Sequence, residues 1–133
     1  MFRFVLNDTS LCFIACHLAA GEQKCEDRIR DIVNIIETKS SFDMASPASR
    51  YAFVNGDSTE VGDHELTFFL GDLNFRVTQL DRETVLETIK RKHYEDLLAH
   101  DELTIEMEQN PTFKLQSFRE PHISFAPTYK YDR

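Results

Sequence analysis

Tryptophan is absent from this sequence, and glycine, proline and cysteine are scarce, with four, four and three copies in 133 residues. The cysteines, Cys12, Cys16 and Cys25, are odd in number, and no secretory signal precedes them because Arg3 interrupts the apolar N-terminus. These features exclude a disulfide framework and predict reduced thiols in a cytoplasmic protein. A zinc site formed by Cys16, His17 and Cys25 stays open as an alternative, although the spacing matches no paired-cysteine motif.

Basic residues are in the minority, since 15 Lys and Arg stand against 23 Asp and Glu and leave a net charge of -8. Broad nucleic-acid binding depends on Lys and Arg neutralising phosphates, so no nucleic-acid partner is expected, whereas one local basic pocket is compatible with this charge. No apolar run reaches the roughly 18 to 20 residues that span a bilayer. Hydrophobic residues make up 41% of the chain, which suffices for one domain with its own core.

Hydrophobic periodicity predicts strand, strand, helix, strand, helices, strand along the chain. The predicted strands cover residues 2–7 and 11–17 as a hairpin, then 66–70 and 122–125; the predicted helices cover 26–39, the segment from Asp81 as a cap to about Lys92, 94–99 and a short segment from Asp101. Residues 40–63 are expected to form a long surface connection with a short strand at 51–54. This order indicates an α/β or α+β arrangement with helices against a sheet. The strands at 66–70 and 122–125 are apolar on both faces and need cover on each side, which is typical of part of a larger sandwich.

Polar groups follow three of the predicted strands. They are His17, then Asp72 with Asn74, then Tyr129 with Lys130. Each has an ordinary structural interpretation, such as a turn built by the Asp and Asn side chains. Together they indicate a phosphoester site, because ligands of open α/β sheets bind beyond the carboxyl ends of strands. A carboxylate can activate water, an amide and an imidazole can donate to phosphoryl oxygens, and Lys with Tyr can bind a second phosphate.

Three motifs, HLAAG at 17–21, GDLNFR at 71–76 and PTYKYD at 127–132, resemble signature motifs of the inositol polyphosphate 5-phosphatase family, in the same order. The resemblance covers nearly the whole chain and is weakest at 40–62. It implies that residues 1–133 are one partial catalytic domain, a central piece of a DNase-like four-layer α/β sandwich that is incomplete at both ends. GDLN also occurs in related nucleases, so a nuclease is an alternative, against which the acidic charge and TYKYD both argue.

The resemblance implies Mg²⁺-dependent removal of the 5-phosphate from phosphoinositide headgroups or soluble inositol polyphosphates, with peripheral membrane contact for lipid substrates. Asp72 matches the acid that orients or deprotonates water, and Asn74 matches the residue that holds the scissile phosphate. His17 matches a histidine that binds a phosphate oxygen. Tyr129 and Lys130 match the pair that grips the neighbouring 4-phosphate.

The departures from the family pattern concern the metal and one catalytic histidine. The family's upstream Asn and Glu, and its downstream Trp-Cys-Asp-Arg and Ser-Asp-His motifs, have no match in this sequence. Mg²⁺ needs a near-octahedral set of oxygen ligands, so its main ligands are expected outside this chain. The loss of one metal carboxylate and one catalytic histidine would each cost a factor on the order of 10³ in rate. The chain alone is therefore expected to be nearly inactive; the alternative is a shortened, non-catalytic module that binds phosphoinositides or a partner.

Overall fold

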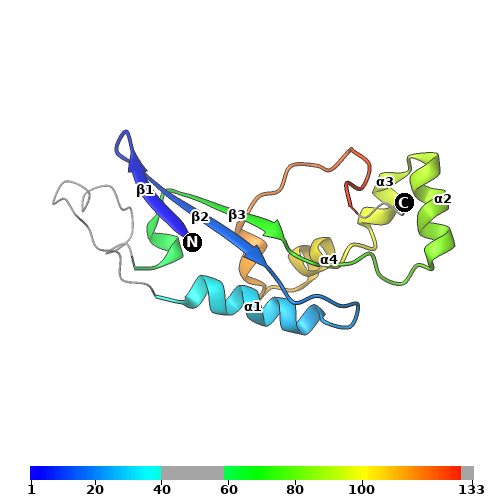
Figure 1. Cartoon of the computed structure of the whole chain (residues 1–133), viewed down its shortest axis with the longest axis horizontal. Coiled ribbons are helices and arrows are strands. Elements are labelled where there is room, and N and C mark those ends of the chain that lie inside the picture. Colours follow the sequence, from blue (N-terminus) through cyan, green and yellow to red (C-terminus); the bar gives the residue numbers. More distant parts are fainter. Residues whose placement is uncertain (40–58, 130–133) are drawn as a thin grey trace. The chain divides into compact units, whose positions relative to one another are not determined.

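The computed structural model describes residues 1–39 and 59–129, which fall into two compact units, Met1–Asn74 and Phe75–Arg133. The first unit contains a three-stranded sheet in the order β1-β2-β3 (Figure 1). The strands are β1 (Phe2–Leu6), β2 (Thr9–His17) and β3 (Leu66–Asp72). The antiparallel pairing of β1 with β2 confirms the predicted hairpin, and β3 lies parallel to β2.

A two-residue turn joins β1 to β2. Asn7 and Asp8 both have positive φ, 47° and 64°, and Asn and Asp are the side chains that tolerate this conformation best after glycine. The turn is shorter than the sequence pattern indicated, because β2 already begins at Thr9.

One face of the sheet is covered by helix α1 (Cys25–Glu37) and the short 3-10 helix η2 (Val61–Asp63). Figure 1 shows α1 running alongside the strands. The core cluster on this face consists of Cys12, Ile14 and Val61, with Ile35 and Phe69 packed against it. Because successive strand residues point to opposite sides, the neighbouring apolar residues of β2 and β3 face away from this core.

The opposite face of the sheet is also apolar, and it is much more exposed. The rings of Phe13 and Phe68 stack with centroids 4.7 Å apart, and Phe4 stacks on Phe13 at 5.9 Å. Phe68 and Leu70 nevertheless remain 43% and 45% exposed. The prediction that the strand at 66–70 is apolar on both faces is thus confirmed, and α1 covers only one of them.

The regular structure described in the second unit is helical. It contains α2 (Arg82–Arg91), α3 (Tyr94–Leu98), α4 (Glu102–Gln109) and the short 3-10 helix η3 (Lys114–Ser117). Asp81 caps α2 by accepting from the Thr84 N–H at 2.8 Å, and Asp101 caps α4 by accepting from the Thr104 N–H at 2.9 Å. These caps confirm the two predicted helix starts.

Two sequence predictions have a different outcome. The predicted strand at 122–125 is wrong, because these residues have no regular structure. An apolar run becomes a strand only when a neighbouring strand takes up its backbone hydrogen bonds, and in the described part of the chain the one sheet ends at β3. The predicted strand at 51–54 lies outside the described residues.

Among the helices that the structure describes, none has the length and apolarity needed to cross a membrane.

His64, which follows η2, is a buried titratable group. Burial, joined by the positive charge of Arg3, holds the pKa of His64 below its ordinary value of 6.5, although its Nδ1 lies 3.2 Å from the Val61 carbonyl oxygen. As the pH falls below the ordinary value, the unfolded chain takes up a proton before the folded chain does. The stability that comes from keeping His64 neutral is therefore fully present above pH 6.5, and it is lost as the pH falls toward the pKa of His64 in the folded chain.

We expect the free energy of unfolding to fall between about pH 7 and about pH 5, and to fall less in His64→Gln, which removes the titrating group. Urea unfolding of both proteins at each pH measures the difference. Equal pH slopes for the two proteins would rule out this role for His64.

Candidate active site

The candidate site lies where β2 and β3 end. Their parallel register pairs Cys16 with Gly71 and His17 with Asp72, so the two polar residues occupy neighbouring positions at the carboxyl edge of the sheet. The backbone ladder continues one step further, because the Leu18 N–H donates to the Asp72 carbonyl oxygen at 3.0 Å. The edge at which open α/β sheets bind ligands thus carries an imidazole and a carboxylate side by side.

His17 and Asp72 form an exposed pair. The distance from His17 Nε2 to Asp72 Oδ2 is 3.7 Å, and the two side chains are 73% and 56% exposed. A pair this open to water contributes little to stability. Both groups are therefore accessible to a ligand, and neither is committed to the core.

Asn74 completes the cluster from the segment that follows β3. Its φ is 57°, in the left-handed region, and its N–H donates to Asp72 Oδ1 at 3.1 Å. This is the turn that Asp and Asn side chains favour, and it fixes the Asp72 carboxylate. The Asn74 Nδ2 donates to the Leu18 carbonyl oxygen at 2.9 Å, so the carboxamide bridges the two strand ends. Asp72 and Asn74 thus form a structural turn and also lie beside His17.

The other two predicted substrate-binding residues follow the first unit in the chain. Tyr129 is described in the second unit, where it is 78% exposed. Lys130 lies outside the described residues. Their assignment to a second phosphate stays a prediction.

Two residues of α1 that were assigned no role from sequence touch the HLAAG segment directly. Arg28, with 0% exposure, donates from Nη1 to the carbonyl oxygens of Ala19 at 3.2 Å and Gly21 at 2.7 Å. Asp31 accepts from the Ala19 N–H at 3.1 Å. The sequence does contain a signal for these contacts. Arg28 and Asp31 carry opposite charges, lie three residues apart and stand next to apolar helix positions, where a buried charge needs polar partners.

The described residues do not assemble a metal site by themselves. Across 1–39 and 59–129, no group of three or more His, Cys, Asp or Glu side chains could hold a metal ion. Cys16, His17 and Cys25 therefore do not form the alternative zinc site. The Cys16 Sγ donates to the Leu70 carbonyl oxygen at 3.6 Å, and burial, with the negative charge of Asp31, raises the pKa of the Cys16 thiol above its ordinary value.

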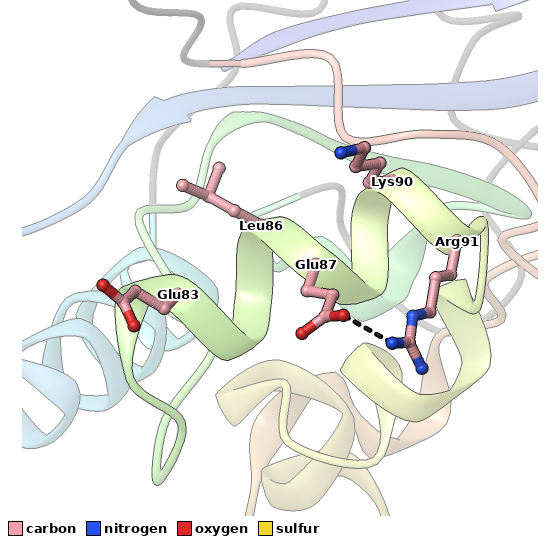
Figure 2. Close-up of a pocket in the computed structure, with 5 residues that line it drawn as sticks. All are labelled: Glu83, Leu86, Glu87, Lys90 and Arg91. Atoms are coloured by element: carbon pink, nitrogen blue, oxygen red, sulfur yellow. Dashed lines mark hydrogen bonds and ion pairs between the residues drawn. The ribbon is translucent and has the colours of Figure 1, made fainter.

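A surface hollow in the second unit holds none of the predicted site residues. Figure 2 shows that its lining comes from α2 alone, with Glu87 paired to Arg91. Its lining residues are Glu83, Leu86, Glu87, Lys90 and Arg91. Charges of both signs on one helix face do not select a phosphate, so the strand edge remains the candidate site.

The chemistry available at this edge suits a phosphate ester. A carboxylate can hold a water molecule or take its proton, and a nearby imidazole can donate to a phosphoryl oxygen as negative charge builds there. The 3.7 Å separation keeps the imidazole and the carboxylate close enough to reach one phosphate and its attacking water.

Comparison with known proteins connects this geometry to a family. Residues 1–133 match Endonuclease/Exonuclease/phosphatase family 2. A probable inositol polyphosphate 5-phosphatase of Schizosaccharomyces pombe is 41% identical over 132 residues, which are 98% of this chain and 11% of that protein. The type II inositol 1,4,5-trisphosphate 5-phosphatase of Mus musculus is 35% identical, over 98% of this chain and 12% of that protein. The chain thus spans about a tenth of the length of these curated relatives.

A solved structure supports the same assignment. The inositol polyphosphate 5-phosphatase domain of SPsynaptojanin, in complex with inositol (1,4)-bisphosphate and a calcium ion, matches with a TM-score of 0.76 and 31% identity. The match covers 98% of this chain and 34% of that chain. It confirms the predicted α/β class and DNase-like fold. On the evidence of its sequence, its strand-edge geometry and this likeness, the chain belongs to the endonuclease/exonuclease/phosphatase family 2.

Proposed function

We propose that this chain carries the phosphate-handling edge of a hydrolase that removes the 5-phosphate from phosphoinositides or soluble inositol polyphosphates. The observation that carries the proposal is the pairing of His17 with Asp72 at 3.7 Å on adjacent parallel strand ends. The names of the relatives and the inositol (1,4)-bisphosphate held by the solved domain support the choice of substrate class.

The proposed roles follow from the atoms at this edge. Asp72 orients the attacking water and accepts its proton, since its carboxylate is fixed by the Asn74 N–H and yet exposed. His17 donates to a phosphoryl oxygen. Asn74 contributes its carboxamide to the scissile phosphate and the water from a position set by its bond to Leu18. Tyr129 and Lys130 bind the neighbouring 4-phosphate, Lys130 as a point charge.

Mg²⁺ is the proposed cofactor, and it would neutralise charge that develops on the transferred phosphoryl group. The residues that the structure describes do not fit a complete site for it, because no group of three His, Cys, Asp or Glu side chains that could hold a metal is present among them. We therefore assign its main ligands elsewhere and derive no step through it. The same proposal places the hydrolase in the cytoplasm, where it contacts the membrane surface that holds its lipid substrates.

A segment-swap protein tests the proposal. In this protein, residues 1–133 replace the matching segment of the SPsynaptojanin phosphatase domain, of which they cover 34%. We expect release of inorganic phosphate from a 4,5-bisphosphorylated inositol lipid when Mg²⁺ is present, and loss of that release when Mg²⁺ is chelated. A folded segment-swap protein that binds inositol (1,4)-bisphosphate but releases no phosphate would contradict the proposal.

The 133-residue chain alone is expected to release phosphate at least about 1,000-fold more slowly than the segment-swap protein, because it lacks matches to the family's metal-placing and Ser-Asp-His motifs. The same phosphate assay compares the two proteins. Equal Mg²⁺-dependent rates would show that the chain supplies these groups itself.

A further inference from the structure

The loop after β2 is held by a helix that contributes no group to the proposed chemistry. Helix α1 directs Arg28 and Asp31, one turn apart, at the backbone of the same loop residue. Arg28 donates to the Ala19 carbonyl oxygen at 3.2 Å, and Asp31 accepts from the Ala19 N–H at 3.1 Å. Both backbone polar groups of one residue, Ala19, are thus fixed by charged side chains.

The neighbouring residue of the loop is held from the other side. Leu18 donates its N–H to the Asp72 carbonyl oxygen at 3.0 Å and accepts from Asn74 Nδ2 at 2.9 Å. Residues 18 and 19 are therefore clamped between α1 and the Asp72–Asn74 turn. His17, the last residue of β2, directly precedes this clamp.

The complete burial of Arg28 costs desolvation energy that stability alone does not require. Replacing a buried ion pair by apolar side chains of similar volume is often neutral or stabilising in other proteins. Arg28 is 0% exposed, and it spends a second hydrogen bond on the Gly21 carbonyl oxygen at 2.7 Å. Its bonds define the conformation of a loop, where backbone partners are otherwise few.

We propose that Arg28 and Asp31 are positioning residues: they fix the loop at residues 18–21 so that His17 faces the same phosphate as Asp72. This inference rests on the proposed function for its ligand. The ordering of the loop by α1 can be judged without it.

The test uses the 133-residue chain and its Arg28→Met and Asp31→Leu variants. The matched control is Arg30→Met, because Arg30 lies on the same helix but pairs with Asp27 at the surface and not with the loop. Three quantities are measured: the urea midpoint, the hydrogen-exchange rate of the Ala19 amide, and the affinity for inositol (1,4)-bisphosphate. We expect Arg28→Met to keep a midpoint close to that of the wild type. We also expect amide exchange at Ala19 to rise, and affinity to fall, each on the order of tenfold.

Arg28→Lys keeps a positively charged hydrogen-bond donor at this position. We expect it to bind inositol (1,4)-bisphosphate more tightly than Arg28→Met does, which would not be the case if Arg28 only filled space. Unchanged Ala19 exchange and unchanged affinity in Arg28→Met would overturn the inference. So would losses of affinity that occur only together with lowered midpoints in both Arg28→Met and Asp31→Leu, since these would indicate a structural role. If the wild-type chain binds no inositol (1,4)-bisphosphate, the proposed function fails, and the Ala19 exchange rates alone then decide whether α1 orders the loop.

Discussion

Changing Asp72 to Asn in the segment-swap protein should lower kcat about 1,000-fold, with a much smaller effect on KM. The substitution is chosen because an Asn oxygen can still accept from the Asn74 N–H, as Asp72 Oδ1 does at 3.1 Å. The turn is therefore kept while the charge that would hold water or take its proton is lost. Initial rates of phosphate release over a range of substrate concentrations separate the two kinetic parameters.

The matched control is Asp8→Asn. This substitution removes one negative charge from the same unit, as Asp72→Asn does. Asp8 lies in the turn between β1 and β2, at the other end of the strands. Its φ of 64° suits Asn equally well, so the fold should not change. Equal rates for wild type and Asp72→Asn would show that the Asp72 carboxylate takes no part in the reaction. Equal losses in both variants would point to net charge instead of position.

Gly71→Ala should have the largest effect on stability, about 3 kcal/mol lower in free energy of unfolding. Gly71 has a φ of 128°, which side chains rarely adopt, and an added Cβ would lie 2.0 Å from the Cys16 carbonyl oxygen. This oxygen belongs to the backbone of β2, so it cannot move aside without breaking the pairing that brings His17 next to Asp72. Urea unfolding of the 133-residue chain measures the loss.

Gly62→Ala is the control for that measurement. Apart from Gly62 itself and its two chain neighbours, no residue has a heavy atom within 4 Å of the position that the Cβ would take, and the backbone of Gly62 is not in the left-handed region. We expect a change within about 0.5 kcal/mol. A Gly71→Ala protein as stable as Gly62→Ala would show that β2 and β3 do not approach as closely as the structure has them.

Periodic patterns predicted those parts of the fold in which local preference and packing agree. The helix at 26–39 appears as Cys25–Glu37 because the face that includes Ile32 packs inward, and the Asp81 and Asp101 caps start α2 and α4. The strand at 122–125 failed because a strand depends on a distant partner, which no local pattern encodes. The extension of β3 to Asp72 was missed for a related reason, since Gly71 is a break signal in sequence but here permits close pairing with Cys16.

The site was predictable to the extent that its residues follow strands. His17 and Asp72 were expected at strand ends, but their shared edge depends on the parallel register of β2 and β3, which the sequence does not state. The contacts of Arg28 and Asp31 with the loop depend on how α1 packs, so the charge pattern alone assigned them no role.

In the proposed mechanism, water held at Asp72 attacks phosphorus at the 5-position. Hydrolysis of inositol 1,4,5-trisphosphate by the segment-swap protein in water enriched in heavy oxygen tests this claim, with both products analysed by mass. We expect inositol (1,4)-bisphosphate without label and one heavy oxygen in the released phosphate. Label in the inositol product, or loss of the 4-phosphate in place of the 5-phosphate, would contradict it.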